Sequence, residues 1–464
     1  MDEFGKDVKS EISKLGWFAS LWPFKGHEAS KALYLSLIFS SLIFAYSIIK
    51  PLKDTVFVSF VGATYIPWAK LLMIISLPIF MYFYLAVGNK HKRTQALVVF
   101  SLVYGIGCLM FIGFMMHPVF GVRCTMSGPF RLLGWLFYAF LDFYSIAVVA
   151  TFWALVNSIS TPEEAKGYYG IMVAASRTAG AVSSGIGALL LRSGLQDIVT
   201  VPILIGMCAA GLFACVFFVL RMFEKVPTDY LKGYSDRHEH HQKKKKLSFW
   251  GGLQSLVTQP YVFYMFWLLC SFELVSTLMN YRMQCLIAQA TTTISGVGSF
   301  MFLYTFSFQV VGAFVALFGT TAILKHLGVR VGLFVTPVIV LSLAVGLIAM
   351  HNLAVITTLM LTLRILDYSV DVPIRQILFI PTTHDIQYGV KGWIASVGKT
   401  VSKTTGSLFN GIATVVSGNA FLMAVTYAPL VLGGFWLLTA NAVGKRYQKA
   451  VENEQVIGED DFSE

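Results

Sequence analysis

The strongest constraint on this chain is a series of apolar stretches, each long enough to cross a lipid bilayer. Of its 464 residues 56% are hydrophobic, and 38 Phe stand against 24 acidic residues. A water-soluble core cannot hide so much apolar surface, so the chain is predicted to be an all-α polytopic membrane protein. With about 20 apolar residues to a span, twelve transmembrane helices are expected at 31–50, 64–87, 94–116, 130–158, 168–192, 199–222, 260–286, 296–323, 329–350, 352–376, 393–416 and 421–441.

A hydrophilic stretch at 223–259 divides the predicted helices into two sets of six. Its run RHEHHQKKKK is interpreted as a solvated linker beside anionic lipid headgroups rather than as a metal or nucleic-acid site. Two six-helix bundles joined by a basic linker are typical of major-facilitator-like transporters. The expected parts are a cytoplasmic N-terminal segment, an N-terminal bundle, the basic linker, a C-terminal bundle and a cytoplasmic tail, at 1–30, 31–222, 223–259, 260–441 and 442–464.

The net charge of +11 lies mainly in the predicted loops. With the N-terminus in the cytoplasm, the basic residues around Lys90, within 221–246 and around Lys445 all fall on the cytoplasmic side. The outward loops then carry chiefly Arg123 and Arg131, and this positive-inside bias predicts that both termini are cytoplasmic. The residues before the first span mix acidic and basic side chains without a continuous apolar core, so no cleavable targeting segment is expected.

Motifs for catalysis and metal binding are absent from the sequence. It contains no HExxH, no GxSxG and no P-loop GxxxxGK[ST], and its six cysteines show neither CxxC nor Cys/His ligand spacing. We therefore expect no enzymatic activity, no metal and no cofactor. A channel is a third functional class, but paired six-span halves with buried opposite charges favour a two-state carrier.

Twelve ionisable side chains lie inside the predicted spans or at their mouths, seven of them basic and five acidic. Charge is costly at these positions, so a shielded polar cavity that suits a negatively charged guest is expected. The twelve fall on the first, fourth, fifth, seventh, tenth and eleventh predicted helices, with the first pair following directly on the end of helix one, and such helices line the cavity of a two-bundle carrier. They are Lys53, Asp54, Asp142, Arg177, Glu273, Arg282, Arg364, Asp367, Asp371, Arg375, Lys399 and Lys403.

Four of these charges lie along the tenth predicted helix. Arg364 and Asp367 are spaced i,i+3, while Asp371 follows Asp367, and Arg375 follows Asp371, at i,i+4. This spacing allows all four to share one stripe of the helix. Two interpretations stay open: the stripe neutralises itself as a gate or charge pair, as Asp54 could beside Lys53, or it contacts the substrate directly.

The eleventh predicted helix carries two lysines and no acid. Lys399 and Lys403 are spaced i,i+4 with Ser and Thr around them, and no acidic residue occurs between 386 and 451. Ammonium groups accompanied by hydroxyl donors form a suitable phosphate seat. The alternative, in which a lysine extends to the membrane boundary, fits Lys399 better than Lys403, which lies one turn deeper.

Four segments resemble the ATP/ADP translocase family of bacterial and plastid nucleotide transporters. They are YSIIKPLKDTVFVSFVGATYIPWAK, FWALVNSISTPEEAKGYYG, SFELVSTLMNYRMQ and VKGWIASVGKTVSKTTGS, which are spread over nearly the whole chain. The resemblance implies that Lys53, Asp142, Glu273 and Lys403 bind nucleotide phosphates or hold counter-charges. Arg282 and Arg177 depart from the usual family pattern, which leaves the particular nucleotide, or another organic phosphate, open.

The implied function is nucleotide transport, most simply exchange of ATP for ADP by alternating access. An empty cavity leaves several cations facing one another at low dielectric, which disfavours the occluded state, and phosphate binding removes that penalty. A carrier that occludes only when loaded performs exchange. If a proton on Asp142 or Glu273 replaces the returning ligand, the same scaffold becomes a proton symporter, and a carrier for another organic phosphate or anion is also open.

The resemblance further implies a monomer in a bacterial inner membrane, with nucleotides and membrane lipids as partners and no nucleic acid. A nucleotide carrier also needs a surface for the base. Tyr138, Tyr144, Phe272 or Tyr281 could stack on adenine, although ordinary helix packing is the favoured interpretation for any one of them.

Overall fold

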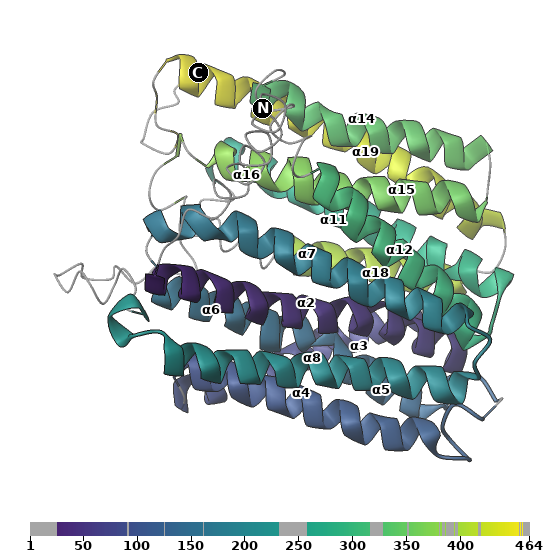
Figure 1. The fold of residues 1–464 in the computed structure, drawn as a ribbon. Helices are drawn as coiled ribbons and strands as arrows, with labels where there is room; N and C mark the ends of the chain where they lie inside the picture. The colour runs from purple at the N-terminus through teal and green to yellow at the C-terminus, as the bar shows by residue number, and fades with distance from the viewer. Residues whose placement is uncertain are drawn as a thin grey trace, which may run out of the picture. The chain divides into compact units, whose positions relative to one another are not determined.

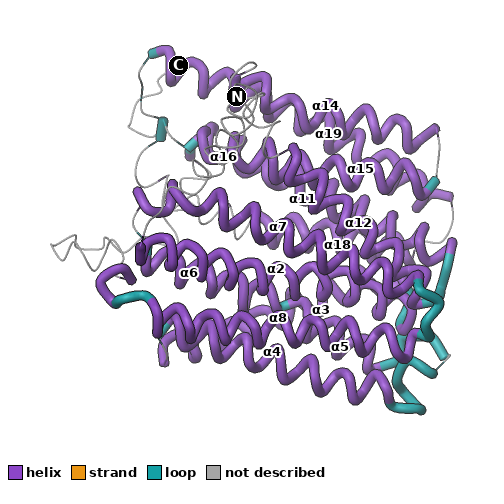
Figure 2. The backbone as a smooth tube through the Cα atoms, in the orientation of Figure 1, coloured by secondary structure: helices purple, strands orange, loops and turns teal. Residues whose placement is uncertain are grey.

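The computed structural model describes residues 26–90, 92–124, 126–160, 162–231, 258–315, 328–349, 352–379, 381–382, 386, 394, 398–415, 419–453, 455 and 457. Over these residues the chain is helical, apart from loops and one isolated bridge between Thr382 and Ile457 (Figure 2). The expected all-α fold is therefore confirmed. Most of the predicted N-terminal segment and of the basic linker, and the end of the tail, lie outside the described residues.

The first half of the chain forms α2 (Gly26–Phe60), α3 (Ile66–Lys90), α4 (Arg93–Met116), α5 (Leu132–Asp142), α6 (Ala150–Ile159), α7 (Pro162–Arg192) and α8 (Asp197–Lys225). The second half forms α11 (Pro260–Ala290), α12 (Ile294–Phe314), α14 (Gly328–Ala349), α15 (Leu353–Leu366), α16 (Val372–Leu378), α18 (Lys399–Val415) and α19 (Asn419–Glu452) (Figure 1). Short helices are η1 (Ala63–Tyr65) and η3 (Thr228–Leu231), and single π turns are η2 (Ser145–Val149) and η5 (Asp367–Asp371).

Within the described residues, nine helical segments are long and apolar enough to cross a membrane. Every predicted span overlaps a helix, but α7, α15 and α18 are not among the nine: α15 is only 14 residues long, and Gly, Ser, Thr and basic residues lower the apolar content of α7 and α18. Twelve spans therefore stay a prediction. The polar character of α7 and α18 is itself informative, since these helices carry Arg177 and the lysines at 399 and 403.

The end of the first helix differs from the prediction. The apolar run predicted a helix ending at residue 50, whereas α2 continues through Pro51 to Phe60. A proline inside a membrane helix is tolerated where neighbouring groups satisfy the carbonyl that it leaves without a donor. As a result, Lys53 and Asp54 lie within a continuous helix instead of closing it.

Contacts between residues divide the chain into two compact units. Unit 1 comprises 1–52, 80–124 and 140–241, and unit 2 comprises 53–79, 125–139 and 242–464. The division does not follow chain order, because the end of α2, the start of α3 and the first part of α5 group with the second half. The two sequential bundles at 31–222 and 260–441 stay a prediction.

Unit 1 contains α4 and α8 packed side by side (Figure 1). Cys108 of α4 and Cys208 of α8 bring their Sγ atoms to 3.7 Å, and all six cysteines of the chain are free thiols. The Tyr144 hydroxyl donates to the Leu42 carbonyl at 3.0 Å, which joins η2 to α2. Lys31 is 2% exposed and donates to the carbonyls of Ile159 and Tyr230. These polar contacts tie the helices of unit 1 together at different heights.

Unit 2 is organised around α11, which packs against α15, α18 and α19. Two glycines, Gly406 of α18 and Gly398 just before it, face α11 closely: a Cβ on Gly406 would lie 3.0 Å from Thr277, and one on Gly398 would lie 3.3 Å from Leu269. Small residues at a helix interface allow close backbone approach in a membrane. Between these two glycines α18 carries both of its lysines, so the close approach brings them to α11.

Candidate functional site

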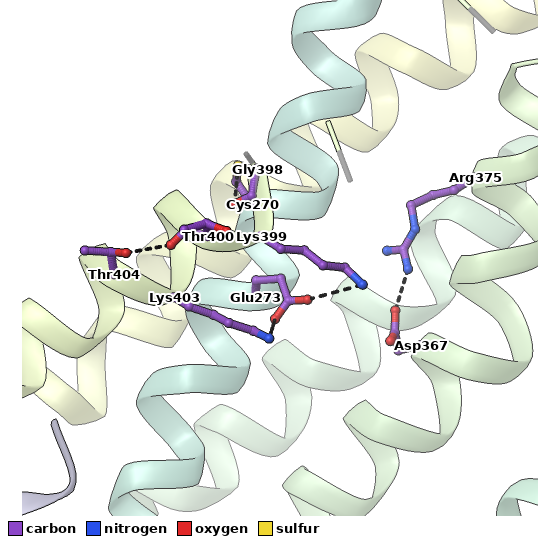
Figure 3. A network of polar contacts seen from close by, with 9 residues as sticks. All are labelled: Cys270, Glu273, Asp367, Arg375, Gly398, Lys399, Thr400, Lys403 and Thr404. Atoms are coloured by element: carbon purple, nitrogen blue, oxygen red, sulfur yellow. Dashed lines mark hydrogen bonds and ion pairs between the residues drawn. The ribbon is translucent and has the colours of Figure 1, made fainter. Parts of the chain in front are cut away.

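Glu273 of α11 lies between the two lysines of α18. Its Oε1 is 4.0 Å from Lys399 Nζ and its Oε2 is 4.0 Å from Lys403 Nζ, and Figure 3 shows both lysine side chains directed at this carboxylate. The side chain of Glu273 is 8% exposed, whereas those of the lysines are 51% and 56% exposed. One buried carboxylate is thus shared by two ammonium groups whose side chains are more than half exposed. We call Lys399 and Lys403 the lysine pair.

The spacing of the lysine pair was visible in the sequence, but its counter-ion was not. Residues at i and i+4 lie on one face of a helix, one turn apart, so both ammonium groups reach the same partner. That partner comes from a helix far away in the chain. The expectation of two cations without an acid holds within α18 alone and fails once α11 is packed against it.

A second charged cluster lies on η5 and α16. Arg375 Nη2 donates to Asp367 Oδ1 at 2.6 Å, and the Thr336 hydroxyl of α14 donates to Asp371 Oδ1 at 2.7 Å (Figure 3 shows the first pair). The side chains of Arg375 and Asp367 are 18% and 10% exposed. The other oxygen of Asp371, Oδ2, is buried without a hydrogen-bond partner among the described residues. We call Asp367, Asp371 and Arg375 the helix-ten cluster.

The π turn changes the pairing that the sequence spacing suggested. An α-helical stripe places Asp371 next to Arg375, but the wider turn at Asp367–Asp371 shifts the register of the residues that follow it. Arg375 then forms its short ion pair with Asp367, two turns back. Asp371 instead takes a donor from a neighbouring helix, which no pattern within the tenth helix predicts.

A third cluster surrounds Lys53 within unit 2. Its Nζ lies 4.2 Å from the centre of the Tyr138 ring and 3.8 Å from Asp54 Oδ1. Asp54 Oδ2 in turn accepts a hydrogen bond from Gln284 Nε2 of α11 at 3.3 Å. The side chains of Lys53 and Asp54 are only 13% and 17% exposed. This lysine is therefore held more closely than the lysine pair on α18.

The other four predicted residues lie on α11, α15, α5 and α7. Arg282 is half-buried on α11, and Arg364 of α15 lies close to Tyr304 of α12. Asp142 ends α5 close to Tyr104, and Arg177 is half-buried on α7. Asp142 and Arg177 belong to unit 1, and the other ten of the twelve residues belong to unit 2. One site that includes all twelve stays a prediction.

Two functional partners were not found from the sequence. Gln284 offered a weak signal, since it lies eleven residues after Glu273 and so shares its face of α11. Thr336 offered none.

Of the aromatic side chains considered for adenine, Tyr144, Tyr281 and Phe272 are at most 2% exposed, so helix packing occupies their rings. Tyr138 is also 2% exposed, but its ring faces Lys53.

Comparisons with known proteins identify the family to which the chain is related. A family model described as TLC ATP/ADP transporter matches residues 7–125 and 132–447. ADP,ATP carrier protein 1 of Chlamydia pneumoniae is 24% identical over 98% of this chain and 99% of its own length. The curated relatives are carriers, not enzymes.

Solved structures show the same fold at low identity. A bacterial homologue of the human lysosomal transporter Spinster superposes with a TM-score of 0.56 at 13% identity, covering 92% of this chain and 98% of that one. The xylose transporter XylE from E. coli gives a TM-score of 0.56 at 11% identity, covering 90% and 95%. The fold is that of a major-facilitator-like membrane transporter. Since the family model matches most of this chain, the chain belongs to the TLC ATP/ADP transporter family.

Proposed function

We propose that this protein exchanges ATP for ADP across a bacterial inner membrane by alternating access, with Lys53, Lys399 and Lys403 binding the phosphates. The observation that carries the proposal is the lysine pair sharing one buried carboxylate. At 4.0 Å, Glu273 neutralises charge but lies beyond the 2.7–3.2 Å typical of an N–H···O hydrogen bond. The ammonium donors therefore remain available for an anion with more oxygens, which a nucleotide phosphate supplies.

Glu273 acts in this proposal as the counter-charge of the empty site. Two unpaired ammonium groups on adjacent turns would repel each other, and the carboxylate between them reduces that repulsion. An incoming polyphosphate replaces Glu273 as the main anionic partner of the lysine pair. The loaded state then differs electrostatically from the empty state, which is what an exchange carrier requires if only loaded protein is to change its facing direction.

The helix-ten cluster is proposed as a structural charge pair at a gate, together with Asp54 beside Lys53 and Arg364 beside Tyr304. The pair of Arg375 and Asp367 is short and mostly buried, as expected of a structural charge pair. Asp142, Arg177 and Arg282 are proposed as further substrate-binding residues. We also propose a monomer with both termini cytoplasmic, in line with the basic residues Lys90, Arg93 and Lys225 at the ends of their helices.

Proton-coupled transport is the second candidate function, and the buried Oδ2 of Asp371 favours it. This oxygen accepts no hydrogen bond from the described residues, which leaves it open to a proton carried together with the substrate. Transport of a nucleotide or another organic anion would then depend on a proton gradient even without nucleotide on the opposite side.

Uptake into proteoliposomes tests the proposal and separates the two candidates. The purified protein is supplied with labelled ATP, ADP, GTP or inorganic phosphate, with and without internal ADP and with and without a pH gradient. Exchange predicts uptake that requires internal ADP, and proton symport predicts uptake driven by an inward proton gradient alone. Absence of nucleotide uptake under every condition, with sound reconstitution, would refute nucleotide transport.

A double variant tests the phosphate seat. Lys399→Gln together with Lys403→Gln removes both ammonium groups while keeping polarity and most of the side-chain length. Uptake of ATP should fall at least about 100-fold, because two charge-assisted hydrogen bonds of roughly 1.5–3 kcal/mol each are lost. Lys449→Gln, in the exposed last turn of α19, is the matched control and should transport normally. Normal transport by the double variant would exclude the lysine pair as the phosphate seat.

A further inference from the structure

The Lys53 ammonium is restrained from two sides, by one group outside the family segment that contains it and by one group within that segment. One is the ring face of Tyr138, whose centre lies 4.2 Å from Nζ, and the other is the Asp54 carboxylate at 3.8 Å. Gln284 Nε2 donates to the other oxygen of Asp54 at 3.3 Å and so fixes the direction of that carboxylate. A flexible four-carbon side chain is thus held in one direction.

The Tyr138 ring is itself fixed by packing. It is 2% exposed, and Phe57, one helical turn after Lys53 on α2, places its ring centre 4.9 Å from that of Tyr138. Trp135, on the turn of α5 before Tyr138, meets the same Phe57 edge-on at 5.1 Å. Because the ring cannot turn away, its negative face stays directed at the ammonium group.

A ring attracts the Lys53 ammonium in a different way from a second carboxylate. A cation–π contact draws the ammonium over the ring without using its N–H groups as an ion pair does, and it adds no negative charge that would repel phosphate. The lysine side chain otherwise loses considerable conformational freedom when it binds a ligand, and a partner that orders it beforehand reduces that loss.

We propose that Tyr138 is a positioning residue, which holds the Lys53 ammonium in place for the substrate phosphate by a cation–π contact and does not stack on the base. The inference rests on the proposed function, because it assigns Lys53 to phosphate binding. It differs from an adenine-stacking role, in which the Tyr138 ring would face the ligand and Lys53 would be unaffected by its removal.

The first test needs no nucleotide. The full-length protein in detergent is treated with a limiting amount of an amine-acetylating reagent, and acetylation of Lys53 is measured by mass spectrometry relative to Lys449. Tyr138→Leu removes the ring but keeps apolar volume, so Lys53 should be acetylated about 2- to 30-fold faster, the range that a cation–π contact of ordinary strength gives. Tyr138→Phe keeps the ring face and should restore slow acetylation.

The second test is a double-mutant cycle on ATP binding. Tyr138→Leu should weaken ATP affinity about 2- to 30-fold in the wild-type background and change it little in the Lys53→Ala background, because a residue acting through Lys53 has no further effect once Lys53 is gone. Tyr138→Phe should restore most of the affinity. Tyr82→Leu, on a ring that is 72% exposed on α3, is the matched control for loss of a tyrosine.

The outcomes separate this inference from the proposed function. Equal acetylation of Lys53 in wild type and Tyr138→Leu overturns the inference whatever the protein transports. Additive losses of ATP affinity in the cycle overturn it as well, since they indicate a role independent of Lys53. Faster acetylation in Tyr138→Leu, together with no ATP binding by the wild-type protein, would support the contact and refute the proposed function.

Discussion

The lysine pair on α18 and the helix-ten cluster hold charges in opposite ways. In the first, two cations that are more than half exposed share one carboxylate at 4.0 Å. In the second, Arg375 and Asp367 are mostly buried and meet at 2.6 Å. A tight, buried pair is costly to break, whereas a loose, open pair can exchange its partner for a ligand at lower cost. Distance and exposure together therefore distinguish a structural charge pair from a candidate binding seat.

The largest expected effect lies in the helix-ten cluster. Asp367→Ala leaves Arg375 buried without its short partner, which should destabilise the protein by about 3–5 kcal/mol. The loss is measured as a lower thermal or denaturant midpoint of the purified protein in detergent. In the double variant Asp367→Leu, Arg375→Met the uncompensated charge is gone, and much of the stability should return. If Asp367→Ala is as stable as wild type, the ion pair of Arg375 and Asp367 does not stabilise the fold, and the contrast with the lysine pair is wrong.

The contact between α14 and η5 should give a smaller effect. Thr336→Val removes the donor to Asp371 Oδ1 but keeps the shape of the side chain, so a stability loss of about 1.5–3 kcal/mol is expected, the range for a hydrogen bond to a charged group. Unfolding in detergent measures it. Thr305→Val is the matched control, because among the described residues its hydroxyl bonds only to the carbonyl one turn earlier in its own helix. A larger loss in the control than in Thr336→Val would contradict the assignment.

The smallest expected effect concerns the lysine pair. Here the substitution should strengthen ATP binding rather than weaken it. Glu273→Gln removes the competing carboxylate, and since the lysines are largely exposed the screened interaction is worth about 1 kcal/mol. The KM for ATP should therefore fall about fivefold, while the maximal uptake rate also falls because the empty site has lost its counter-charge. Initial rates of uptake over a range of ATP concentrations measure both. A raised KM would show that Glu273 supports phosphate binding rather than competing with it.

Much of the fold could be predicted because hydropathy is a local property. All twelve expected spans overlap helices, and the family model confirms the resemblance to ATP/ADP translocases that the segments YSIIKPLKDTVFVSFVGATYIPWAK and FWALVNSISTPEEAKGYYG carry. The errors have local causes as well. Pro51 does not end α2, and a π turn at Asp367–Asp371 breaks the i,i+4 stripe of the tenth helix. Sequence patterns assume one regular helix and cannot foresee such changes of register.

Local sequence patterns were sufficient to predict a helical membrane protein, costly charges on a few of its helices, and two lysines on one face of the eleventh predicted helix. The partner of each charge became known from the folded chain alone: Glu273 for the lysine pair, Asp367 for Arg375, and Tyr138 for Lys53. The physical reason is that burial follows from the composition of consecutive residues, whereas an ion pair or a cation–π contact depends on the distance between side chains that the chain itself keeps far apart.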